Sequence, residues 1–216
     1  MTIDVYTWPT PNGHKVHILL HEAEIEHSII PINIQEGDQF KQDFLKISPN
    51  NKMPAIVDPD GPDGEPISVF ESAACLMYLA DNSGKFLPSD ARKRYDVLQW
   101  LFFQMGSVGP MLGQCHHFNA YAPLREPEER LRYAQDRYIN EGTRIYGVID
   151  RQLDGKGWIA ADEYTIADIA TYPWVARYDW QNVDLADFPN VKRWFDELSA
   201  RPAVDKGMNV LAPPAS

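Results

Sequence analysis

A proline directly before a short apolar run constrains this chain most. Residues 50–57 read Asn-Asn-Lys-Met-Pro-Ala-Ile-Val, so Pro54 stands where a strand begins, a position that tolerates its missing N–H. A cis bond between Met53 and Pro54 would turn the Met53 backbone outward, so that its N–H and C=O could pair with an extended peptide. We therefore expect a cis-proline loop that binds a peptide backbone.

A helix start follows this loop in the sequence. Ser72 comes directly after Glu71 and opens a segment with apolar residues at helical spacing. The unpaired N–H groups and the positive dipole end of a helix suit a carboxylate. Together, the loop and the helix start predict a site for a short acidic peptide.

The first part of the chain alternates strand and helix patterns. Helical spacing is expected at residues 16–23, 44–47 and from 72 onward, and strands at 3–6, 26–33, 55–58 and 67–70. Turn chemistry fills residues 8–13 and 59–64. This β-α-β then β-β-α order predicts a thioredoxin-like domain with a four-stranded mixed sheet over residues 1–83.

Only helical patterns follow a linker at residues 84–90, which is rich in Gly, Pro, Ser and Asp. Helices are expected at 94–105, 126–153 and 191–198, and Thr165 with Asp168 fits a capping box that opens a buried helix. The fold class is therefore α/β plus all-α, with an all-helical domain over residues 91–216.

The charge and the cysteines exclude several classes. A formal net charge of −11 argues against nucleic acid or an anionic membrane as a partner, and requires a local positive site for any anionic ligand. Cys75 and Cys115 form neither a disulfide framework nor a CxxC motif. No apolar stretch is long enough for a membrane span, and no signal-peptide pattern opens the sequence, so we expect a soluble, cytoplasmic protein.

Three motifs carry a family resemblance. Thr10–Lys15 (TPNGHK), Ser48–Lys52 (SPNNK) and Gly113–Phe118 (GQCHHF) resemble the nu class of the glutathione transferase superfamily, bacterial enzymes that reduce disulfides with glutathione. Cys115 stands where that class has an asparagine. The resemblance covers nearly the whole chain. It implies a homodimer with glutathione, reduced or as the disulfide, as its co-substrate, and small thiols and disulfides as partners.

The resemblance implies that Thr10 and Asn12 lie beside the glutathione sulfur. A free thiol with a pKa of about 8.5 is only slightly ionised at neutral pH, and two hydrogen-bond donors could lower that pKa by about two. From the residues alone, Thr10 and Asn12 could equally cap the following helix. Tyr6, in the apolar strand pattern, is expected to pack in the core.

Further residues match family positions that hold the backbone and carboxylates of glutathione. These residues are Gln39, Lys52, Met53, Glu71 and Ser72. Lys52 could otherwise be an ordinary surface lysine. Arg137 matches an arginine that reaches a glutathione carboxylate, in its own subunit or across a dimer, with Arg132 and Arg144 as nearby alternatives.

The adjacent His116 and His117 would point in different directions on a helix, so we expect a structural or substrate-pocket role and no metal site. Nothing near Cys115 marks a depressed pKa, and Cys75 is expected in the core. The resemblance thus implies a glutathione-dependent disulfide-bond reductase. The alternatives are an enzyme that conjugates glutathione to electrophiles and a non-catalytic binding or regulatory protein of the same fold.

Overall fold

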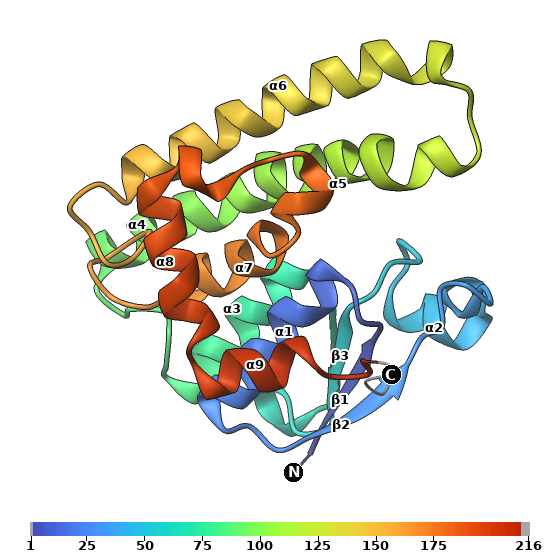
Figure 1. Ribbon diagram of the computed structural model, residues 1–216. Helices are drawn as coiled ribbons and strands as arrows, with labels where there is room; N and C mark the ends of the chain where they lie inside the picture. Colours follow the sequence, from blue (N-terminus) through green and yellow to red (C-terminus); the bar gives the residue numbers. More distant parts are fainter. Residues whose placement is uncertain (1, 213–216) are drawn as a thin grey trace. The chain divides into compact units, whose positions relative to one another are not determined.

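The computed structural model describes residues 2–212, which form two compact units. One unit combines the N-terminal segment through Leu87 with the C-terminal segment from Ala200, and the other spans Pro88–Ser199. Figure 1 shows the sheet within the first unit and only helices in the second. The predicted combination of a thioredoxin-like domain and an all-helical domain is confirmed.

The first unit is built on a four-stranded mixed sheet in the order β2-β1-β3-β4. The strands are β1 (Ile3–Thr7), β2 (His27–Pro31), β3 (Ala55–Asp58) and β4 (Ile67–Phe70). β1 pairs with β2 in parallel and with β3 antiparallel, and β3 pairs antiparallel with β4. The parallel pair requires a crossover, which helix α1 (Pro11–Ala23) supplies. The predicted bounds of β3 and β4 are confirmed, and β2 is shorter than the expected 26–33.

Helices α1 and α3 (Ser72–Ser83) pack against each other, and α2 (Gln42–Ile47) is the short helix expected near residues 44–47. The apolar positions predicted on α1 are buried, as are Cys75 and Leu76 on α3. Leu79 also lies in the core, and Met77 is half-buried. The expected turn at 8–13 ends sooner, because Pro11 is accommodated at the first position of a helix.

The C-terminal helix α9 (Pro202–Met208) packs on α1, and Figure 1 shows the two side by side. His14 Nδ1 lies 3.3 Å from the Gly207 carbonyl oxygen. Arg201 donates two hydrogen bonds to the Glu22 carboxylate, at 2.6 and 2.8 Å. These contacts explain why the segment from Ala200 belongs to the sheet-containing unit, whereas the sequence patterns predict a thioredoxin-like domain over residues 1–83 alone.

The second unit contains five α-helices among its described residues, α4 (Ala91–Phe103), α5 (Gly109–His116), α6 (Glu128–Gln152), α7 (Ile166–Val175) and α8 (Pro189–Ser199). Wider π-helical turns at Gln104–Val108 and His117–Tyr121 flank α5. On α4, Val97 and Leu101 are buried, whereas the apolar side chains of Tyr95 and Phe102 are exposed. None of the helices described is both long and apolar enough to cross a membrane.

Asp168 joins α7 to α8 in the core of the second unit. Its carboxylate is fully buried and accepts hydrogen bonds from the backbone N–H groups of Ile159 and Thr165, both at 3.0 Å, and from Trp194 Nε1 at 2.9 Å. Burial raises the pKa of Asp168 to about 6. The Thr165 side chain completes the predicted capping box, which is confirmed.

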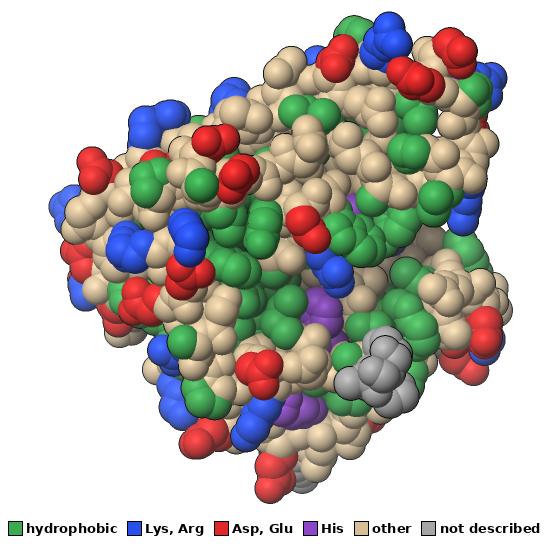
Figure 2. Space-filling model, in the orientation of Figure 1, with side chains coloured by type: hydrophobic (Ala, Val, Ile, Leu, Met, Phe, Trp, Pro, Cys, Tyr) green, Lys and Arg blue, Asp and Glu red, His purple; other side chains and the backbone are tan. Residues whose placement is uncertain are grey.

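On the face that Figure 2 shows, acidic and basic side chains are interspersed rather than gathered by sign. Charged side chains also pair along α6, including Arg132 Nη2 with Glu128 Oε1 at 3.0 Å. Exposed pairs of this kind contribute little to stability, about 0.3–0.5 kcal/mol each.

The contact between α9 and α1 yields the first prediction. A Cβ added to Gly207 would lie 2.7 Å from the backbone N and Cα of Ile18, which cannot move away as a flexible side chain could. We expect Gly207→Ala to lower the free energy of unfolding by about 1–3 kcal/mol in urea titrations. Gly157→Ala is the matched control, because a Cβ there would meet nothing within 4 Å. Equal stability of the two variants would contradict close packing of α9 on α1.

Candidate functional site

The pairing of the strands places three segments of the first unit at the same end of the sheet, where β1 and β4 end and β3 begins. Ala55, the residue after the proline, lies opposite Tyr6 of β1 and opposite Phe70 of β4. These three paired residues form one row across the sheet. Next to that row in the sequence lie the β1–α1 turn, the proline loop and the N-terminus of α3. Three side-chain contacts described below connect these segments and α1.

The proline loop has the expected conformation, because the Met53–Pro54 peptide bond is cis. Pro54 is buried and Met53 half-buried, and Met53 packs against a core cluster that includes Phe44 and Ala55. The buried Ser48 hydroxyl donates to the Lys52 carbonyl oxygen at 2.7 Å and so fixes the loop. None of the hydrogen bonds found among residues 2–212 uses the N–H or C=O of Met53, so both groups are suited to pairing with a peptide.

Thr10 has two contacts that correspond to the two roles considered for it. As the N-cap of α1, its hydroxyl oxygen accepts from the Gly13 N–H at 3.3 Å. The same hydroxyl donates to Met53 Sδ at 3.5 Å, across to the proline loop. A thioether is a weak acceptor, so a thiolate brought to this position would be a better partner for the hydroxyl. Asn12 is half-buried and lies at the second position of α1, inside the cap.

The N-terminus of α3 is held by Glu71 and Ser72. Glu71 occupies the N-cap with φ 70° and ψ 118°, a conformation that costs free energy in a residue other than glycine and is often found at functional sites. Its side chain does not cap the helix and instead accepts from Asn50 Nδ2 of the proline loop, at 3.4 Å. Glu71 thus connects the loop to the start of α3.

A residue to which the sequence analysis gave no role, Lys15, lies beneath this helix start. Lys15 on α1 is 0% exposed and donates from Nζ to Ser72 Oγ at 3.2 Å. Burial lowers the pKa of Lys15 to about 7, and the negative charge of Glu71 partly opposes that effect. A signal was present in the sequence, because Lys15 precedes Leu19 by four residues and so shares its buried helical face.

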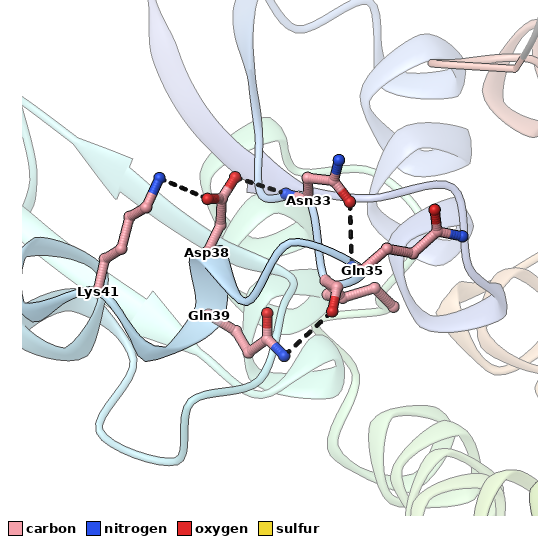
Figure 3. Close-up of polar contacts among 6 residues, drawn as sticks. Asn33, Gln35, Asp38, Gln39 and Lys41 are labelled. Carbon is pink, nitrogen blue, oxygen red and sulfur yellow. Dashed lines mark hydrogen bonds and ion pairs between the residues drawn. The ribbon is translucent and has the colours of Figure 1, made fainter.

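Gln39 lies in a separate loop, drawn in Figure 3. The Asp38 carboxylate organises the loop by accepting from the Asn33 N–H at 3.0 Å and pairing with Lys41 at 2.5 Å. Gln39 Nε2 donates to the Ile34 carbonyl oxygen at 3.3 Å, and its Oε1 is buried without a hydrogen-bond partner among the described residues. In this orientation Gln39 presents an acceptor, which suits an N–H group of a ligand.

Lys52, in the proline loop, is another predicted ligand residue, and its side chain is exposed.

Arg137 belongs to the helical unit and lines a cavity of about 620 Å³ together with Tyr133 and Glu141. Its guanidinium lies over the Tyr138 ring, 6.0 Å from the ring centroid. The alternatives Arg132 and Arg144 are each paired with a glutamate on α6, at 3.0 and 2.7 Å. Within the described residues Arg137 forms no such ion pair, which distinguishes it from them.

Both cysteines are buried thiols. Cys115 Sγ donates to the Gln181 carbonyl oxygen at 3.2 Å, and burial raises the pKa of this thiol to about 11. Cys75 Sγ donates to the Val69 carbonyl oxygen at 3.3 Å, and burial raises its pKa to about 12. Neither side chain is a thiolate near neutral pH, so neither has the character of a nucleophile.

The two histidines beside Cys115 differ in their surroundings. His116 is buried, with its ring stacked on Tyr121 at 4.8 Å and edge-on to Trp180 at 4.6 Å, whereas His117 is exposed. Burial lowers the pKa of His116 to about 4, so the ring is neutral at physiological pH. No group of three or more His, Cys, Asp or Glu side chains suited to a metal ion occurs in the part of the chain that the structure describes.

Comparison with known proteins identifies two family domains that together cover most of the chain. Residues 10–82 match the N-terminal domain of glutathione S-transferases, and residues 113–202 match the C-terminal domain. Among curated relatives, disulfide-bond oxidoreductase YfcG of Escherichia coli is 48% identical over 207 residues, which are 95% of this chain and 94% of YfcG.

Solved structures give the same result. A glutathione transferase family member from Pseudomonas fluorescens, crystallised with two glutathione molecules, matches with a TM-score of 0.89 and 43% identity over 96% of this chain and 92% of its own. A Pseudomonas putida enzyme with one bound glutathione disulfide matches with a TM-score of 0.89 and 41% identity over 98% and 92%. This chain therefore belongs to the glutathione S-transferase family.

Proposed function

We propose that this protein is a glutathione-dependent disulfide-bond reductase that acts by thiol–disulfide exchange with bound glutathione. The observation that carries the proposal is the contact of the Thr10 hydroxyl with Met53 of the cis-proline loop, at 3.5 Å, in a domain whose cysteine is buried. The oxidoreductase name of YfcG and the glutathione ligands of the two bacterial structures support it.

Each end of glutathione has a proposed binding partner in the first unit. The backbone of Met53 would pair with the peptide, and the start of α3 at Ser72 would take a carboxylate. Glu71 and the Gln39 oxygen are acceptors and would take N–H groups, while the exposed Lys52 would take an anionic group. Arg137 remains a proposed carboxylate ligand, in its own subunit or in a partner subunit.

The reaction would proceed in two exchanges. The glutathione thiolate, stabilised by the Thr10 hydroxyl and the Asn12 amide, attacks one sulfur of the substrate disulfide. A mixed disulfide forms, and the other substrate sulfur leaves as a thiolate. A second glutathione thiolate then attacks the glutathione sulfur of the mixed disulfide. The products are glutathione disulfide and two substrate thiols, so two glutathione molecules supply the two electrons.

Transfer of glutathione to an electrophile is the second candidate, because it would use the same stabilised thiolate. A non-catalytic binding or regulatory protein is the third. Parallel assays of disulfide reduction and of conjugation to chlorodinitrobenzene separate the three, since only the reductase favours the first reaction and the binding protein performs neither. We further propose a cytoplasmic homodimer that acts on small thiols and disulfides.

The proposed thiolate donors are tested by substitution. We expect Thr10→Ala and Asn12→Ala each to lower disulfide reduction roughly tenfold or more, because a lost hydrogen bond to a charged group of about 1.5 kcal/mol corresponds to about that factor. Thr10→Ser keeps the hydroxyl and is the matched control that should retain most of the activity. Activity unchanged in Thr10→Ala would leave this residue with only its helix-capping role.

The absence of a protein nucleophile is tested with the cysteines. A Cys75→Ser, Cys115→Ser double variant should keep most of its reductase activity, and in the native protein both thiols should react slowly with iodoacetamide near neutral pH, because burial raises their pKa values to about 12 and about 11. Labelling of the urea-unfolded chain provides the control for reagent activity. A folded double variant that binds glutathione but reduces no disulfide would identify a protein thiol as the nucleophile.

A further inference from the structure

A buried hydrogen bond ties the end of β1 to helix α1. Thr7, the last residue of β1, and His17 on α1 are both 0% exposed, and His17 Nε2 lies 2.9 Å from Thr7 Oγ1. This is an ordinary hydrogen-bond distance. The whole β1–α1 turn lies between these two residues in the sequence. The pair therefore connects the start of that turn to the helix that follows it.

Gly13 brings the start of α1 against the same residue. A Cβ added to Gly13 would lie 2.3 Å from the Trp8 carbonyl oxygen and 2.8 Å from Thr7 Oγ1. Gly13 and His17 are four residues apart, so they share one face of the helix. The close approach at Gly13 and the hydrogen bond of His17 thus hold Thr7 at two points along this face.

Thr10 lies midway between Thr7 and Gly13, inside the turn that these contacts anchor. The Thr10 N–H donates to the Trp8 carbonyl oxygen at 2.8 Å, the same oxygen that Gly13 approaches. The Thr10 hydroxyl reaches Met53 Sδ of the proline loop at 3.5 Å. The place of this hydroxyl relative to the proline loop therefore depends on how the turn is anchored at Thr7.

We propose that His17 is a positioning residue for the Thr10 hydroxyl. Through Thr7 it holds the β1–α1 turn where that hydroxyl can donate to the sulfur of glutathione, a placement that a functional group needs to within about 0.5 Å. This inference rests on the proposed reductase function. In a purely structural role, the pair of His17 and Thr7 would stabilise the domain and leave the ionisation of bound glutathione unaffected.

The test changes each partner of the hydrogen bond with and without loss of the bonding group. Thr7→Val and His17→Leu remove it, whereas Thr7→Ser and His17→Gln keep a group that can form it. Disulfide reduction by glutathione is measured across a pH titration, and glutathione binding by calorimetry. We expect Thr7→Val and His17→Leu each to lower kcat/KM near neutral pH about threefold or more, with the thiol ionisation displaced to higher pH, because the Thr10 hydroxyl is misplaced. Thr7→Ser and His17→Gln should retain most of the activity.

Combination with Thr10→Ala separates positioning from stability. His17→Leu should have little further effect in Thr10→Ala, because no hydroxyl is left to position. A loss of general stability would lower activity equally with and without the Thr10 hydroxyl. Ile18→Val is the matched control, because Ile18 is the next residue of α1 and is also 0% exposed. This variant should be slightly less stable in urea titrations and keep the wild-type pH profile.

Three results overturn the inference. If folded Thr7→Val and His17→Leu keep the wild-type pH profile while Thr10→Ala loses activity, Thr10 is positioned without this pair and the proposed function stands. If His17→Leu lowers activity equally in both backgrounds, its role is structural. If wild type does not reduce disulfides with glutathione, the proposed function fails and this inference fails with it.

The Thr7→Val, His17→Leu double variant covers the case in which a single variant does not fold. One buried polar group left without its partner is destabilising, whereas replacing both partners by apolar groups of similar shape can be nearly neutral. The double variant should show the same displaced thiol ionisation as the single ones. Burial lowers the pKa of His17 to about 3, so titration of this ring does not overlap with that of the thiol. A folded double variant with the wild-type pH profile would contradict the proposed role.

A measurement on wild type needs no variant to fold. Saturation with glutathione should shift the ¹⁵N signal of His17 Nε2 more than saturation with the analogue in which alanine replaces the cysteine, because only glutathione offers a sulfur to Thr10. Equal shifts with both ligands would show that Thr10 and His17 are not connected and would overturn the inference.

Discussion

The backbone pairing of Ala55 determines where the site can form. Ala55 lies opposite Tyr6 on one side and Phe70 on the other, so the ends of β1 and β4 meet the start of β3 in a single row. Three features lie within a few residues of that row in the sequence: the cis bond before Pro54, the Thr10 cap and the helix start at Ser72. A slip of one residue in either pair would move every side chain to the other face and separate these elements.

The arrangement divides the chemistry between protein and ligand. The protein supplies hydrogen-bond donors and a helix end, and its two thiols lie in surroundings that hold their pKa values far above neutral pH. Glutathione would supply the sulfur.

The features that could be predicted from sequence are those that depend on residues close together in the chain. Turn residues and Pro54 bounded β3 and β4, and the pairing of Thr165 with Asp168 was evident from their spacing. The features that were not anticipated depend on distant residues: Lys15 is buried on α1 and donates to Ser72, and α9 joins the sheet-containing unit because Gly207 lets it approach Ile18. The predicted site residues can be tested only with a ligand bound, so their roles all stay predictions: Thr10, Asn12, Gln39, Lys52, Met53, Glu71, Ser72 and Arg137.

The pKa of the glutathione thiol in the bound state tests most directly whether the site ionises that thiol. Glutathione labelled with ¹³C at its cysteine Cβ, bound to the Cys75→Ser, Cys115→Ser variant, reports the ionisation by NMR across a pH titration without interference from protein thiols. We expect a pKa about two below that of free glutathione, because two hydrogen bonds stabilise the thiolate. A bound thiol that titrates at the same pH as in free glutathione would contradict the account.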